Sequence, residues 1–304
     1  MPERARAFIS DETSFDLSPD VMLRKVCMDF PWLVSAAIME KAGLPKEERN
    51  AMPFPHIKMM GGEESIPIHV FWHGAQLSRM ALLSLRSMAR FGETVLHSFK
   101  DPPVNLPEGV TWSNAEWVLG RDFMATCPEV RYFSDLFRYA LLATHEGPII
   151  WSDLDVIWLK RPGRVEGGRF FAATQWTGWD RGHAVVGNVL YSSPLERGAP
   201  WGQLLSASQA LLDSDKTEFG TIGPLLLTKL MEPSDVVRPQ EFNPISPNEV
   251  DLLWRRSQRS QAEVLCETST GVHLWSCVWE QRGLTLDDVH PSSYLGRLMK
   301  ELES

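Results

Sequence analysis

The pattern of hydrophobic and polar positions changes near residue 63. Upstream, apolar residues recur at helical spacing from Val21 to Leu33, and residues 52–62 combine prolines and glycines as linkers do. Downstream, short apolar runs alternate with longer amphipathic stretches. We therefore expect a helical extension and linker over residues 1–62 and one α/β domain over residues 63–304.

The expected elements of the α/β domain follow from these periods. Strands are predicted at residues 66–74, 94–99, 110–112, 149–151, 169–176 and 184–192. Helices are predicted at residues 76–91, 134–146, 201–212, 222–231 and 291–302. Because strands and helices alternate over most of this length, we expect a mostly parallel, Rossmann-like central sheet flanked by helices.

The most informative stretch is residues 134–162, which read SDLFRYALLATHEGPIIWSDLDVIWLKRP. Ser134 is a residue type that begins helices, and Gly147–Pro148 ends the apolar helical pattern. A short apolar run follows, as in a strand buried on both faces. Asp153 and Asp155 come at its carboxyl end, where open α/β sheets bind their ligands.

The residue types in this stretch suggest a specific chemistry. Asp153 and Asp155 are two residues apart on extended backbone, so their carboxylates point to one side and can hold Mn²⁺ or Mg²⁺ beside a diphosphate. The alternative is a solvated turn, but the order of helix, stop, strand and aspartates favours the binding interpretation. Asp135 and Arg138 share one helix face, either as an ordinary ion pair or as ligand contacts.

This block resembles the donor-site signature of sugar-nucleotide transferases with the GT-A fold. The similarity is to DXD-containing enzymes of glycosyltransferase family 32 and the capsular polysaccharide synthesis type, and it spans about residues 66–279. Pro148 departs from the family, which usually has a second glycine there. The resemblance implies that Asp153 and Asp155 are catalytic and bind the metal, and that Asp153 also contacts the donor.

Other patches carry further implications of the same resemblance. The resemblance over residues 66–74 implies that Trp72 stacks against a uracil ring, and a position in the core is the alternative. The nearby His69 is expected to lie in the core. Residues 271–279, GVHLWSCVW, suggest that His273 completes the metal site or touches the diphosphate, unless it is a core histidine. The remaining implied donor contacts are Ser134, Asp135, Arg138, Asn188 and Gly223, with Gln175 as a weaker candidate.

Composition narrows the class of partner. The chain has 304 residues, 43% of them hydrophobic and 23% charged, which is ordinary for a globular protein. A net charge of -9 argues against binding nucleic acid. The N-terminus is polar, without the pattern of a signal peptide, and the apolar run at residues 32–39 is too short to cross a bilayer. We expect a cytoplasmic protein; peripheral contact with the inner face of a membrane stays open.

The resulting hypothesis is a metal-dependent glycosyltransferase. It would move a sugar from a UDP-linked donor to a hydroxyl of a saccharide, lipid-linked or protein acceptor, with retention, in polysaccharide or glycolipid synthesis. Two alternatives remain: a metal-dependent phosphoesterase, which would need more His and Asp ligands in tight motifs, and a non-catalytic carbohydrate- or nucleotide-binding protein of the same fold. The sequence singles out no catalytic base or nucleophile.

Overall fold

The computed structural model describes residues 66–161, 170–176, 183–193, 200–213, 220–231 and 235–304, together with the backbone of residues 59–60 and 164–165. The predicted helical extension over residues 1–62 lies outside the described residues, apart from strand β1 (Met59–Met60), which pairs antiparallel with β7 (Arg164–Val165).

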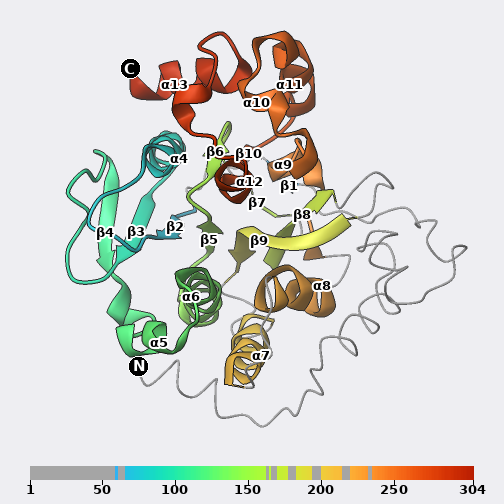
Figure 1. Ribbon diagram of the computed structural model, residues 1–304. Helices are drawn as coiled ribbons and strands as arrows, with labels where there is room; N and C mark the ends of the chain where they lie inside the picture. Colours follow the sequence, from blue (N-terminus) through green and yellow to red (C-terminus); the bar gives the residue numbers. More distant parts are fainter. Residues whose placement is uncertain are drawn as a thin grey trace, which may run out of the picture.

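A six-stranded sheet forms the centre of the molecule, in the order β4-β3-β2-β5-β9-β8 (Figure 1). Its first four members are parallel to one another, while β9 runs antiparallel to both β5 and β8. The fold is therefore α/β with a mixed, mostly parallel sheet, which is compatible with a Rossmann-like fold. The strands are β2 (Ile68–Phe71), β3 (Thr94–Ser98), β4 (Val110–Asn114), β5 (Ile149–Ser152), β8 (Phe170–Trp176) and β9 (His183–Ser192).

Helices cover both faces of the sheet. Three of them, α6, α7 and α8, pack on one face with a core that includes Phe133, Phe137 and Trp151, while α4 packs on the other face (Figure 1). A C-terminal group of helices, α10 to α13, forms a third apolar cluster. The α-helices are α4 (Arg79–Ala89), α5 (Arg121–Thr126), α6 (Val130–Thr144), α7 (Trp201–Asp213), α8 (Leu226–Leu230), α9 (Pro239–Phe242), α10 (Asp251–Trp254), α11 (Arg259–Cys266), α12 (Ser276–Gln281) and α13 (Tyr294–Glu303).

The strand order creates a crevice at a defined place. From β2 the chain adds β3 and then β4 on one side, and it returns to place β5 on the other side of β2. Such a reversal opens a space outside the carboxyl ends of the two strands that flank it. Trp72 follows β2 and Asp153 follows β5, so both lie at this switch point.

A small second sheet carries the chain from the switch point to the C-terminal region. Strand β6 (Val156–Trp158) pairs antiparallel with β10 (Gly271–His273), and His273 lies opposite Val156 in the register. The Leu274 N–H donates to the backbone oxygen of Asp155 at 2.7 Å. This pairing brings residues 273–276 beside the second aspartate.

Most predicted boundaries shift by a few residues, and two of the differences bear on the site. Helix α6 begins at Val130, so Ser134 lies inside the helix and the prediction that it caps the N-terminus is wrong. Buried Tyr132 and Phe133 extend the apolar face by one turn, and their burial outweighs the preference of serine for a cap. The helix expected at residues 222–231 instead begins with a π-helical turn, η5 (Thr221–Leu225), because Pro224 cannot donate a regular helical hydrogen bond.

His69 lies in the core, as predicted. Its Nδ1 is 2.8 Å from Nε2 of His97 on the neighbouring strand β3, and both rings are buried under α6 near His145. None of the helices in the described residues combines the length and apolar character needed to cross a bilayer.

Candidate active site

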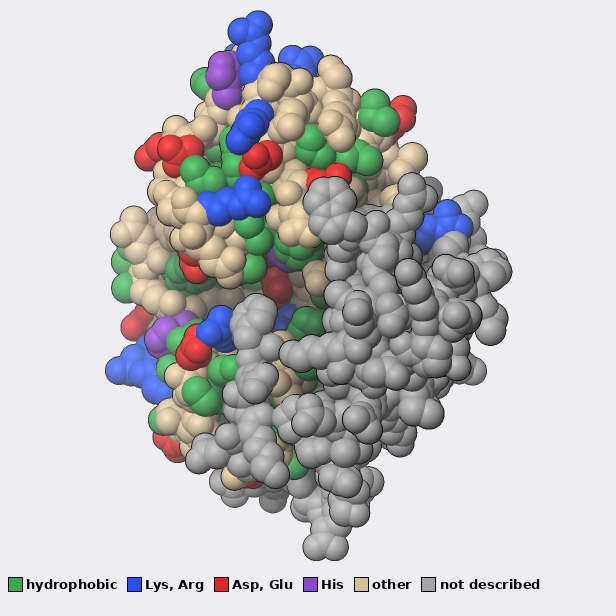
Figure 2. Space-filling model, turned by 45° about the vertical axis from the view of Figure 1, so that its right-hand side comes forward, with side chains coloured by type: hydrophobic (Ala, Val, Ile, Leu, Met, Phe, Trp, Pro, Cys, Tyr) green, Lys and Arg blue, Asp and Glu red, His purple; other side chains and the backbone are tan. Residues whose placement is uncertain are grey.

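A cleft of about 830 Å³ opens at the carboxyl ends of β2 and β5. The space-filling view shows a hollow there, with acidic side chains inside it (Figure 2). The cleft brings together almost all the side chains that the sequence suggested: Trp72, Ser134, Asp135, Arg138, Asp153, Asp155, Gln175, Asn188 and His273. Their roles stay predictions, but their convergence from six separate parts of the chain defines the candidate site.

A second groove, of about 680 Å³, lies between α11 and α13. Its two arginines share one acidic partner, since Glu263 pairs with Arg259 at 2.9 Å and with Arg297 at 3.0 Å. It lies away from the carboxyl ends of the strands, and we therefore place the candidate chemistry in the cleft.

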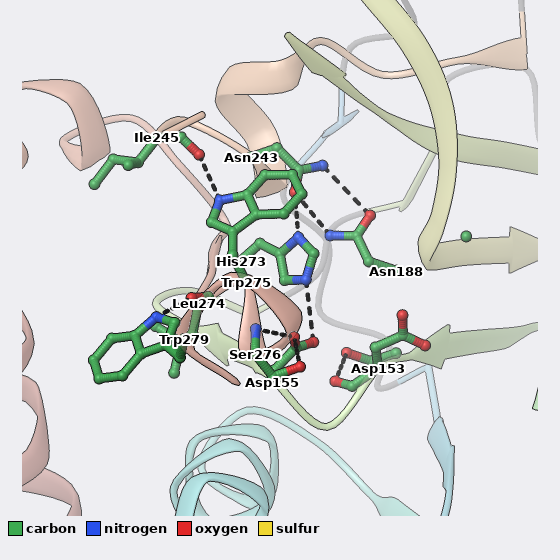
Figure 3. Close-up of polar contacts among 12 residues, drawn as sticks. Asp153, Asp155, Asn188, Asn243, Ile245, His273, Leu274, Trp275, Ser276 and Trp279 are labelled. Carbon is green, nitrogen blue, oxygen red and sulfur yellow. Dashed lines mark hydrogen bonds and ion pairs between the residues drawn. The ribbon is translucent and has the colours of Figure 1, made fainter. Parts of the chain in front are cut away.

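Asp155 is held by the last residue of β10 and by the first residue of α12 (Figure 3). Its Oδ1 lies 3.1 Å from Nε2 of His273, while its Oδ2 accepts hydrogen bonds from the Ser276 N–H at 2.9 Å and the Ser276 hydroxyl at 2.7 Å. Trp275 between them has a left-handed backbone with φ of 60°, which is uncommon for a residue with a side chain. This sharp turn lets His273 and Ser276 reach the same carboxylate.

Asp153 is held from the opposite side, by the sheet and α6. The Trp151 indole N–H donates to its Oδ1 at 2.9 Å, and Arg138 Nη1 lies 3.4 Å from the same oxygen. The two aspartates of the motif are thus fixed by different elements, although only one residue separates them in the chain.

The surroundings shift the pKa values of the two carboxyl groups in opposite directions. Burial raises the pKa of Asp153 above its ordinary value, and the charge of Asp155 adds to this against the opposing charge of Arg138. Burial would also raise the pKa of Asp155, but the charge and hydrogen bond of His273 and the hydrogen bonds from Ser276 outweigh it and hold that pKa below its ordinary value. Divergent pKa values in neighbouring carboxyl groups are typical of functional sites.

Arg138 is a buried cation, with only 8% of its surface exposed. It pairs with Asp135 one helical turn earlier and with Asp153, and it donates to the backbone oxygen of Gly187 at 2.6 Å. Its position is made possible by Gly187, because a Cβ atom there would lie 2.6 Å from the Arg138 Cζ.

Gly187 belongs to a bulge in β9. Ala172 of β8 pairs with Leu190, but the next residue, Ala173, pairs with Val186, so that residues 187–189 have no partner in β8. Bulges redirect the backbone and side chains of a strand. Here the bulge directs the Gly187 carbonyl toward Arg138 and the Asn188 side chain into the site.

Gly223 does not line the cleft but lies directly behind Asp135. A Cβ atom on Gly223 would be 3.5 Å from both carboxylate oxygens of Asp135, so the π-helical turn approaches this side chain closely. Its neighbours Gly220 and Pro224 do line the cleft. Trp72 is half-buried at the cleft wall after β2, which leaves part of its ring accessible.

Three residues of the site were not predicted from the sequence. Ser276 could have been noticed, since it stands three residues after His273 in the motif that carries the resemblance. Gly187 and Asn243 carry no local signal, because their importance comes from the β9 bulge and from contacts with residues distant in sequence.

The structure also bears on metal binding. In the part of the chain that the structure describes, no group of three or more His, Cys, Asp or Glu side chains is arranged to hold a metal ion. Asp155 and His273 are in contact, whereas Asp153 is engaged by Arg138 and Trp151. The predicted set of Asp153, Asp155 and His273 is therefore not a preformed three-ligand site.

Comparison with known proteins adds no identification: no protein-family model matches the chain, and no curated protein is significantly similar to it in sequence.

Proposed function

We propose that this protein is a metal-dependent glycosyltransferase of the GT-A type, which uses a UDP-linked sugar as donor. The observation that carries the proposal is the pair of differently held aspartates, Asp153 and Asp155, at the switch point of an α/β sheet. The α/β fold and the cleft agree with this class. The GT-A assignment and the donor rest on the sequence resemblance.

The cleft suits a ligand of the expected size and character. Its volume of about 830 Å³ falls in the range of small-molecule sites, about 300–1,000 Å³. Trp72 at one wall offers a flat apolar face for a base, and Asp135 with Arg138 offers directed acceptors and donors for a sugar. Since Arg138 is already engaged with two carboxylates and a carbonyl, we infer that it acts mainly by orienting Asp135 and Asp153.

The residues present fit Mn²⁺ or Mg²⁺ as a partly protein-bound ion. Ions that serve substrate phosphates take one or two carboxylates from the protein and further oxygens from phosphate and water. Asp155 and His273 would hold the cation, with the Ser276 hydroxyl in reach. The 3.1 Å between Asp155 Oδ1 and His273 Nε2 matches the spacing of adjacent ligands that each lie about 2.1 Å from an octahedral ion.

When bound, such a cation offsets the negative charge that develops on the departing diphosphate. The protein's own contribution is to fix the geometry: Ser276 and His273 hold Asp155, Trp151 and Arg138 hold Asp153, and Trp72 positions the base. The acceptor hydroxyl would enter from the open side of the cleft.

The test is the variant Asp155→Ala, with the isosteric Asp155→Asn beside it to preserve packing. We expect both to abolish Mn²⁺-dependent release of UDP from nucleotide-sugars and to remove the Mn²⁺ dependence of UDP binding in calorimetry. Asp287→Ala, an exposed acid far along the chain, is the control and should change neither. Folded Asp155 variants with unchanged turnover and affinity would refute the assignment, and release of UMP and sugar 1-phosphate instead of UDP would favour a phosphoesterase.

A further inference from the structure

We propose that Asn243 is a positioning residue that keeps a proton on Nδ1 of His273, so that Nε2 is the ring nitrogen that faces the cation site. This inference rests on the proposed function only in its last step, the cation. The hydrogen bonds that set the tautomer can be observed in the protein without any metal.

The orientation of the Asn243 amide follows from its partners, of which Figure 3 labels Asn188 and His273. Its Nδ2 lies 2.8 Å from the backbone oxygen of Thr174, which can only accept a hydrogen bond. The opposite orientation of the amide would place two acceptors against each other. Nδ2 is therefore the donor to Thr174, and Oδ1 must face the other way.

The Oδ1 atom of Asn243 then accepts from two donors. Asn188 Nδ2 donates to it at 2.9 Å, and His273 Nδ1 lies 3.1 Å from it. Since Oδ1 has no proton to give, the hydrogen bond with His273 requires a proton on Nδ1. In a neutral imidazole, Nε2 is then the unprotonated nitrogen, which is the form that binds metals.

The other ring nitrogen points at the proposed site. His273 Nε2 lies 3.1 Å from Asp155 Oδ1, which is a hydrogen-bond distance when no cation lies between them. A cation held by both atoms would replace this hydrogen bond. Metal-binding histidines are commonly oriented in this way by a hydrogen bond from their other ring nitrogen.

The ring has little freedom to turn away. Asn243 is fully buried and Asn188 is 3% exposed, so their hydrogen bonds are shielded from water. On its other side, the His273 ring is 4.0 Å from the Trp275 ring, whose indole N–H donates to the Ile245 carbonyl. By donating a hydrogen bond to Asn243, Asn188 supports the orientation of His273, in addition to its predicted contact with the donor.

The experiment measures the tautomer first and the metal second. Protein labelled with ¹⁵N-histidine gives long-range ¹H–¹⁵N spectra that distinguish the two neutral tautomers, and the His273→Gln variant identifies the signal among the eight histidines. We expect a proton on Nδ1 of His273 in the wild type and its loss in Asn243→Leu. By electron paramagnetic resonance with Mn²⁺ alone, Asn243→Leu should bind the ion 10- to 100-fold more weakly.

Two further variants make the result decisive. Asn105→Ala removes a partly buried asparagine that bonds only to Leu77 in a loop, and it should leave the tautomer and Mn²⁺ affinity unchanged. Asn188→Ala keeps the hydrogen bond between Asn243 and Thr174 but removes one donor to Asn243, so it should weaken Mn²⁺ binding by a smaller factor. It is the test variant if Asn243→Leu does not fold.

The outcomes separate the two proposals. An Nε2–H tautomer in the wild type, or Asn243 and Asn188 variants with unchanged spectra and unchanged Mn²⁺ affinity, would overturn the positioning role. A proton on Nδ1 in a wild type that binds no Mn²⁺, with or without UDP, would support the role of Asn243 while overturning the proposed metal-dependent function.

Discussion

Replacing Gly187 with alanine should expel the Arg138 guanidinium from the wall of the cleft. The new Cβ would lie 2.6 Å from Arg138 Cζ and closer still to Nη1, and a contact under 3 Å cannot persist. The backbone next to Gly187 is held by β5, since Val189 pairs with Ser152 and the Asn188 carbonyl accepts from the Asp153 N–H, so we expect the flexible arginine to move rather than the strand.

The cost follows from what Arg138 leaves behind. Its departure removes the partner of two carboxylates, Asp135 and Asp153, of which Asp135 is 13% exposed in its side chain. Breaking a buried ion pair by removing one partner costs about 3–5 kcal/mol. We expect the free energy of unfolding of Gly187→Ala to fall by an amount in this range.

Urea unfolding of the purified variant measures this loss, with Gly147→Ala as the matched control. At Gly147 a Cβ would meet only the His145 ring at 3.5 Å, an ordinary contact, and stability should change by less than about 1 kcal/mol. In Arg138→Met the clash is absent, so adding Gly187→Ala should cost much less than it does in the wild type. Additive losses, or equal effects at the two glycines, would refute the reasoning.

Three other predictions concern the base, the sugar and the sheet. Trp72→Ala should weaken UDP binding by about 1–3 kcal/mol in calorimetry, the range for stacking of a base on an aromatic ring, whereas a mere core role would lower the melting temperature and leave affinity intact. Arg138→Ala should impair binding of the whole UDP-sugar much more than binding of UDP alone, because it releases Asp135 and Asp153 at the sugar end of the cleft; equal losses for both ligands would contradict this. Burial, with the charge of neighbouring histidines, lowers the pKa of His69 to about 2 and that of His97 to about 3 from an ordinary value of 6.5. The unfolded chain therefore takes up protons below pH 6.5 that the folded chain excludes, and stability should fall as the pH decreases from about 6 to about 4, with a slope that approaches about 1.4 kcal/mol per pH unit for each histidine. In urea titrations His69→Asn should flatten this dependence, and an unchanged slope would argue against it.

The α/β fold and the position of the aspartates could be predicted from the sequence because both depend on local patterns. The run at residues 149–151 is a buried strand, and Asp153 and Asp155 follow it as expected. The sequence pattern predicts the start of α6 too late, because Ser134 is a good capping residue. The residue that caps the helix in the structure, Glu129, makes no side-chain hydrogen bond and so gives no such signal. In that helix the burial of Phe133 decides the boundary, and only the packed sheet reveals it.

The contacts within the site depend on pairings between distant segments. His273 could be suspected from its motif, but its place beside Asp155 follows from the register of β6 with β10. Asn243 has no motif at all: it follows the short helix α9, and its amide connects Thr174 of β8 with His273 of β10. Such three-way contacts are set by the tertiary structure, and no periodicity in the sequence encodes them.

The different supports of Asp153 and Asp155 explain why a motif of two aspartates cannot by itself define a site. Asp153 is tied to α6 and β5, which form the rigid centre of the fold, through Arg138 and Trp151. Asp155 is tied through Ser276 to α12, in the C-terminal helical part of the chain. The same three-residue sequence in a solvated turn would have neither support, and its carboxylates would repel each other and separate in water. What distinguishes this pair is the set of buried partners on each side, which holds two negative charges at one end of a cleft.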